Sequence, residues 1–251
     1  MLVASLSLLI GMLLGGQNIS AYIVEDLPKE IKANVDDKEK QKEILSITKA
    51  YEKEFKGVQK DLKKSKKQMK KLNLDRNTTP ESINAVLDEA DNSWKEVQTL
   101  GLKSRSAVLE MLSQEEWSGI ISKSLEDYSK KDLKKQDKAL EDFEKKFDKL
   151  KKDVAKEITD PKRQENIFAT FDTFKVDMEN YVAANRKRTI KDMGDFGNLE
   201  ASEAELQQEL SSLDEARSQF FEGIEKLHFE LVENTTEEEW AKIAKSVNKI
   251  F

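Results

Sequence analysis

The chain has 251 residues, of which 37% are charged, and its 43 basic and 49 acidic side chains leave a net charge of −6. Both signs are spread along the chain, so no nucleic-acid partner is expected. The lack of cysteine excludes disulfides, thiol catalysis and cysteine-ligated metals, and the single histidine leaves any metal site to carboxylates. Only three prolines and nine glycines occur, which favours long helices.

The first 24 residues contain no charged side chain, and residues 2–14 are an apolar stretch. A membrane span needs about 20 apolar residues, whereas a secretory signal has a shorter apolar region that ends in small residues. We therefore expect residues 1–21 to be a signal peptide cleaved after Ala21, and the protein to be periplasmic or secreted. The alternative is an N-terminal membrane anchor, in which case only residues 1–24 would contact the membrane.

From Ile44 to Leu72, apolar residues recur at alternating steps of four and three, which predicts a helix that buries one face. The outward positions of the second part of this segment are basic. Such a face is either a solvated surface or a surface for an acidic partner. Its nine lysines are Lys53, Lys56, Lys60, Lys63, Lys64, Lys66, Lys67, Lys70 and Lys71.

Helix starts are marked by two recurring signals. The first signal, a capping residue followed by proline, occurs at residues 79–80 and 160–161. The second is a capping box, in which a hydroxyl side chain and a glutamate three residues later each accept from the backbone amide of the other. It occurs at residues 113–116 and 236–239. In the helix expected after residue 80, the spacing of the apolar residues places Ser104 on the face that is expected to be buried. The glycine-containing residues 193–198 predict a hinge or hairpin. The expected caps are Thr79, Ser113, Glu116, Asp160, Thr236 and Glu239.

Two stretches of the chain resemble each other. The sequence Leu-Asp-Glu-Ala begins at Leu87 and again at Leu213, and a capping box followed by tryptophan ends at Trp117 and again at Trp240. The two offsets are 126 and 123 residues, which predicts a duplicated helical hairpin with a three-residue length difference. We place the halves at residues 22–131 and 132–251, as one bundle or two. Trp117 and Trp240 are expected to pack in the core, as is Trp94.

The segment at residues 112–116, Leu-Ser-Gln-Glu-Glu, resembles the Leu-Thr-x-x-Gln motif of small periplasmic helical stress proteins. Serine replaces threonine and glutamate replaces glutamine in this chain, and the resemblance covers about ten residues, so it does not make the chain a member. What the resemblance implies is a chaperone-like role outside the cytoplasm.

Motifs for catalysis are scarce. Glu225 and His228 have the helical spacing of carboxylate-bridged di-iron bundles, but that site needs a second histidine, so we expect His228 to be an ordinary surface or boundary residue. Clustered glutamates at helix starts are explained by the helix dipole. No glycine-rich nucleotide loop or serine nucleophile motif occurs. We therefore expect no enzyme, no catalytic residue, no metal and no cofactor.

These patterns predict an all-α protein: an elongated, antiparallel, coiled-coil-like helical bundle. Its two halves are either duplicated hairpins or segments that share short matches only because the chain is rich in glutamate and leucine and capping boxes recur at helix starts. The leading hypothesis is an extracytoplasmic, non-enzymatic protein that acts by binding, as a chaperone-like protein, a scaffold or an accessory subunit. One alternative is a membrane-tethered coiled-coil spacer, and the other is a carboxylate-metal enzyme. The expected partner is an unidentified protein, and the same stripes allow a homo-oligomer.

Overall fold

The computed structural model describes residues 22–121, 124–211 and 214–250, and every regular element of these residues is an α-helix. We call residues 22–121 the N-terminal half and residues 124–250 the C-terminal half. The helices of the N-terminal half are α3 (Leu27–Asn34), α4 (Lys38–Leu72), α5 (Pro80–Leu109) and α6 (Gln114–Ile121). Those of the C-terminal half are α7 (Ser124–Glu157), α8 (Pro161–Gly197), α9 (Glu203–Ser211), α10 (Asp214–Glu233) and α11 (Glu237–Ile250).

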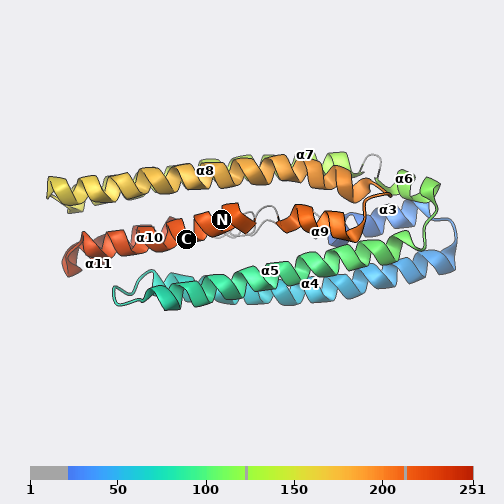
Figure 1. The fold of residues 1–251 in the computed structure, drawn as a ribbon, viewed down its shortest axis with the longest axis horizontal. Helices are drawn as coiled ribbons and strands as arrows, with labels where there is room; N and C mark the ends of the chain where they lie inside the picture. Colours follow the sequence, from blue (N-terminus) through green and yellow to red (C-terminus); the bar gives the residue numbers. More distant parts are fainter. Residues whose placement is uncertain (1–21, 122–123, 212–213, 251) are drawn as a thin grey trace.

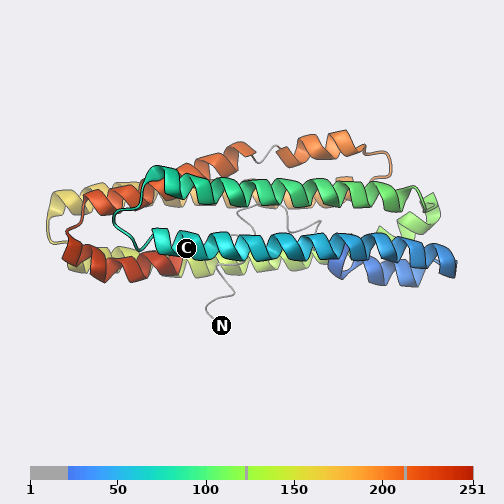
Figure 2. The ribbon, with the colours of Figure 1, turned by 90° about the horizontal axis from the view of Figure 1, so that it is seen from below.

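The long helices run side by side and make a rod (Figure 1). The antiparallel pair α4 and α5 forms one long side, and α7 and α8 form the opposite side, with α9 and α10 between them. The turn between α4 and α5 lies at the same end of the rod as α11, whereas α6 lies at the other end with the turn between α8 and α9 (Figure 2). The predicted elongated helical bundle is thus confirmed.

The core follows the apolar stripes of the long helices. One aromatic cluster fills the C-terminal half, where Phe147 of α7 lies 5.1 Å from Phe171 of α8, measured between ring centroids. A second cluster fills the N-terminal half, and it also contains Tyr128 and Phe196 of the C-terminal half. Because buried rings cross between the halves, the two halves share one bundle.

Two details of the chain differ from the sequence-based expectations. Helix α8 continues to Gly197, so the hinge predicted at residues 193–198 is wrong for residues 193–197, and the turn begins only at Asn198. Gly194 lies inside this helix, and a Cβ at its position would meet no atom within 4 Å. Helix α7 runs without interruption through residues 131 and 132, where the boundary between the halves was placed. The expected signal peptide at residues 1–21 lies outside the described residues.

None of the described helices combines the length and the apolar character that crossing a bilayer requires. Most apolar residues of the long helices face the bundle, and most of their charged residues face solvent, with Arg105 of α5 a buried exception. The rod is therefore held together by narrow buried stripes, as its low apolar content predicts.

Candidate functional site

Each end of the rod is closed by a tryptophan. The indole nitrogen Nε1 of Trp117 in α6 donates to the carbonyl oxygen of Gly197, at 2.8 Å, and Nε1 of Trp240 in α11 donates to that of Leu74, at 3.1 Å. Both side chains are buried, and Trp94 is fully buried in α5. Trp117 of the N-terminal half thus packs where α8 ends and the turn to α9 begins, and Trp240 of the C-terminal half packs on the turn between α4 and α5. We call these two connections the long-helix turns.

The glutamate directly before each tryptophan forms an ion pair, and the two pairs have corresponding positions in the two halves. Glu116 completes the capping box with Ser113 and accepts from Lys40 Nζ at 2.5 Å. In the other half, Glu239 completes the box with Thr236, and the Arg163 guanidinium donates two hydrogen bonds to its carboxylate, at 2.7 and 3.0 Å. These bonds hold the pKa of Glu239 near 2 and lower that of Glu116.

Further contacts recur at the same interval of 123 residues. The Gln41 and Gln164 side chains each donate to one carbonyl oxygen in the last turn of the preceding helix and to one just after its end. Asp37 and Asp160 each cap the helix that follows. Thr79 caps α5, and Ser202, exactly one interval later in the chain, caps α9 together with Glu205. The interval is constant through these contacts, so they show no length difference of three residues. Leu213, which suggested the difference, lies outside the described residues.

Arginines fix the two long-helix turns. The buried Arg105 guanidinium donates to the carbonyl oxygens of Phe196, Asn198 and Ala201, and it stacks over the Phe196 ring at 5.7 Å. The expectation that Ser104 lies on the buried stripe of α5 is wrong, because Arg105 takes that place and Ser104 is only half-buried. At the other end, Arg76 donates to the carbonyl oxygens of Val232 and Thr235.

His228 stands one interval after Arg105, and it is buried, contrary to the expected surface or boundary position. Its ring meets Phe229 and Trp240 edge-on, with centroids 5.1 and 5.5 Å away. Neither ring nitrogen has a hydrogen-bond partner in the described part of the chain. Burial lowers the pKa of His228 to about 4, against a smaller opposing effect of Asp75.

Because His228 is buried in its neutral form, we expect the free energy of unfolding to fall in acid. The unfolded chain takes up the proton near pH 6.5 and the folded chain only near pH 4, so the free energy of unfolding should fall by about 2–3 kcal/mol as the pH drops through that window. Urea titrations at several pH values measure the slope, and the ring protons of this single histidine report its pKa directly by NMR. The His228→Leu variant should lose the slope, and an NMR pKa near 6.5 in the folded protein would contradict the burial.

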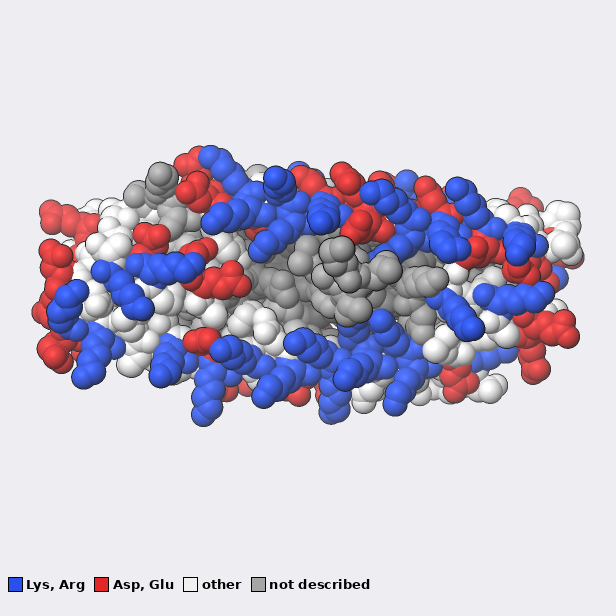
Figure 3. All heavy atoms as spheres, turned by 180° about the vertical axis from the view of Figure 1, so that it is seen from behind, with Lys and Arg blue, Asp and Glu red and all other residues white. Residues whose placement is uncertain are grey.

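The nine lysines between residues 53 and 71 of α4, which we call the lysine face, lie along one side of the rod, where a row of basic side chains follows the helix (Figure 3). Seven of them are exposed, while Lys66 and Lys70 are half-buried. Lys56 pairs with Glu52 on its own helix and Lys64 with Glu89 of α5. Within the described residues, Lys60, Lys63 and Lys67 pair with no carboxylate.

Lysines of α7 add to the positive potential of this side. Burial, followed by the charges of Lys70 and Lys146, lowers the pKa of Lys66 to about 8, and burial also lowers that of Lys146. Lys146 of α7 therefore acts electrostatically on Lys66 of α4, while Asp142 opposes the lowering of the Lys146 pKa.

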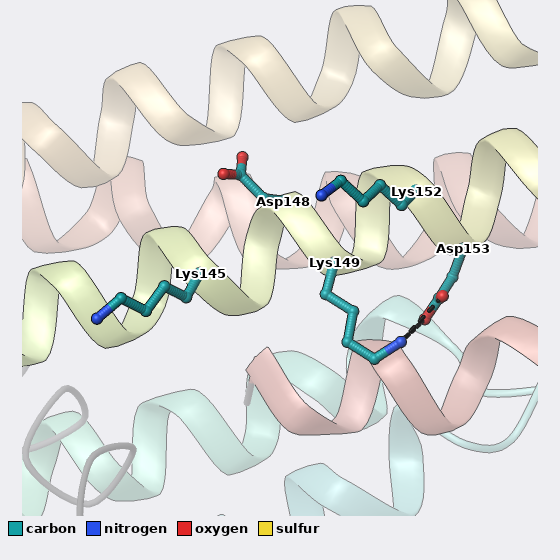
Figure 4. Close-up of a pocket in the computed structure, with 5 residues that line it drawn as sticks. All are labelled: Lys145, Asp148, Lys149, Lys152 and Asp153. Carbon is teal, nitrogen blue, oxygen red and sulfur yellow. Dashed lines mark hydrogen bonds and ion pairs between the residues drawn. The ribbon is translucent and has the colours of Figure 1, made fainter.

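A shallow hollow of about 450 Å³ lies on α7, lined by Lys145, Asp148, Lys149, Lys152 and Asp153 (Figure 4). Lys149 is bound to Asp153 at 2.9 Å, and the Ser246 hydroxyl of α11 donates to the same carboxylate. Because Lys149 and Asp153 neutralise each other and Lys145 is paired with Glu141, we assign no binding role to this hollow. The described residues also contain no group of three His, Asp or Glu side chains that could hold a metal ion, and Glu225 and His228 are not part of one.

Sequence reasoning missed Arg105, Arg76, Gln41 and Gln164, whose partners lie in other segments of the chain. The Ser202–Glu205 capping box carries the same signal as the two predicted boxes and could have been found. Comparison with protein-family models, with curated proteins and with solved structures finds no match to this chain.

Proposed function

We propose that this chain is a non-enzymatic binding protein: a rigid helical rod that holds an acidic partner against the lysine face of α4. The observation that carries the proposal is the row of exposed lysines, because α4 contains thirteen lysines and only five carboxylates in a chain whose net charge is negative. A surface so different from the whole molecule is suited to selective, electrostatically guided association.

Comparison of the two halves distinguishes residues that maintain the fold from residues that are available to bind a partner. The recurring caps, tryptophans and glutamines support a duplicated unit, and these residues maintain the fold in both halves. The lysine face does not recur, because the positions 123 residues after its lysines hold only two basic residues, Arg186 and Lys187, and include Val176 and Glu179. The same helical plan therefore forms without a lysine row, which favours a role for the row outside folding.

The test uses poly-L-glutamate as the probe and the full chain with Lys60, Lys63 and Lys67 all changed to glutamate. We expect the wild type to bind with an affinity that falls with salt, and the variant to bind at least about tenfold more weakly. The matched control changes the exposed Lys103, Lys187 and Lys226 of other helices to glutamate and should keep most of the affinity. Equal losses in both variants would mean that only net charge matters and would overturn the proposal.

Because all six positions are exposed, both variants should keep the free energy of unfolding within about 0.5 kcal/mol of the wild type, as measured by urea titration. A variant that unfolds readily would be replaced by the corresponding glutamines, which remove charge without adding repulsion.

We further propose that the protein works outside the cytoplasm, on the basis of its apolar first residues. N-terminal sequencing of protein from its native cell tests this: a chain that begins at Tyr22 indicates secretion, whereas one that keeps Met1 and fractionates with membranes indicates a tethered rod. A soluble cytoplasmic chain that keeps Met1 would overturn both alternatives.

A further inference from the structure

The lysine face has a regular geometry. Lys53, Lys56, Lys60, Lys63 and Lys67 follow one another at alternating steps of three and four, so they form a straight stripe parallel to the axis of α4. From residue 53 to residue 67 the stripe is about 21 Å long, with about one charge for each 5.4 Å turn.

A glycine lies beside this stripe. Gly57 lies in the middle of α4, is exposed, and has no atom within 4 Å of the position that a Cβ would take. A glycine inside a helix costs about 0.5–1 kcal/mol relative to alanine, and no turn or close contact among the described residues requires one here. Its absent side chain leaves a notch between Lys53, Lys56 and Lys60 where another backbone can come close.

We propose that the lysine face docks an acidic α-helix of a partner protein, which lies along α4 and approaches it most closely at Gly57. This inference rests on the proposed function and names the partner's chemistry. A helix that carries carboxylates at steps of three and four has the same pitch as the lysine stripe, so each of its turns meets one turn of α4. The notch at Gly57 allows the two axes to come toward the short end of the usual 8–10 Å range.

Other polyanions fit this surface less well. Single-stranded nucleic acid is bound on exposed aromatic side chains, and membrane surfaces bind helices whose apolar residues face the lipid. The apolar residues of α4 face the core, and among the described residues the exposed large hydrophobics are Leu74 and Val176, which lie outside the stripe. Acidic side chains gather at both ends of this side of the rod (Figure 3), so a broad anionic surface would meet repulsion that a single helix along the stripe avoids.

The test compares two peptides of about 20 residues, made of the same glutamates and alanines. One peptide carries its glutamates in a single helical stripe, and the other distributes them around the helix. Fluorescence anisotropy with the full chain should give an affinity about tenfold higher for the striped peptide. Equal affinity would overturn the inference and leave the proposed function standing, provided that the lysine reversals still weaken binding of poly-L-glutamate at least about tenfold. Tighter binding to oligo-dT or to vesicles with anionic lipid would also overturn it.

The notch has its own matched pair of variants. Gly57→Leu should raise the helix stability of α4 and reduce affinity for the striped peptide about tenfold, because the added side chain holds the partner away. Gly194→Leu is the control, since Gly194 also lies inside a helix with open space around it but outside the lysine face. It should stabilise the fold similarly and keep the affinity. Equal peptide affinity of the two variants would overturn the close approach at Gly57.

Discussion

Replacing Trp117 or Trp240 by alanine should lower the free energy of unfolding by about 3–5 kcal/mol in each case. Each indole is buried at an end of the rod and is the largest side chain that joins one half to the turn of the other. Its removal leaves a cavity and also an unpaired carbonyl oxygen, at Gly197 or at Leu74. A urea titration monitored by circular dichroism measures this decrease in the free energy of unfolding. A cost near zero for both variants would mean that these side chains do not close the bundle.

Phenylalanine variants separate packing from hydrogen bonding. Trp117→Phe and Trp240→Phe keep most of the ring but remove the donor to the turn, whereas Trp94 is equally buried and its Nε1 has no partner in the described structure. The first two substitutions should therefore cost about 1 kcal/mol more than Trp94→Phe. Equal costs for all three would show that the bonds to the turns contribute little.

Helix starts were predictable from the sequence because their signals are local. Asp160 followed by proline and the box at Ser113 and Glu116 are contained within four residues, and the hydrogen bonds observed are those that the spacing predicts. The same is true of the apolar stripes, which identify a buried face without identifying what covers it. The fold class followed from these two signals.

The contacts that join the halves could not be predicted in this way. The partners of Arg105 lie more than 90 residues away, and a charged residue is placed on a buried face only when its carbonyl partners are known. For the same reason His228 looked like a surface residue. The short motif at residues 112–116 had suggested a chaperone-like relative, but its hydroxyl and carboxylate are accounted for by the capping box and by Lys40.

At the two ends of the rod, positions that are 123 residues apart hold different side chains. Arg105 and His228 stand 123 residues apart, as do Arg76 and Leu199. Arg105 lies on α5 and donates to the end of α8, whereas Arg76 lies in the turn after α4 and donates to the end of α10. The end that contains Trp117 is held by the buried Arg105 guanidinium, whereas the end that contains Trp240 has the half-buried Arg76 and the buried imidazole of His228, whose pKa is lowered to about 4. Acid should therefore weaken the end that contains Trp240 before the end that contains Trp117.

Arg105→Met is the substitution that tests the buried guanidinium, and it should lower the free energy of unfolding by about 3–4 kcal/mol. Methionine keeps much of the aliphatic volume, so the loss comes chiefly from the carbonyl oxygens of Phe196, Asn198 and Ala201, which lose their donor. Arg76→Met is the matched control. It also removes a donor from carbonyl oxygens of the other half, but Arg76 is only half-buried and water can replace it, so we expect about 1–2 kcal/mol.

Combining these substitutions shows whether the two ends unfold independently. Arg105→Met and Trp117→Phe both act on the turn that begins at Asn198, so their costs should differ from a simple sum by about 0.5 kcal/mol or more. Arg105→Met and Trp240→Phe act at opposite ends and should add. A cost of Arg105→Met below about 1 kcal/mol would show that the turn relaxes to reach water, and that packing of Trp117 alone holds that end.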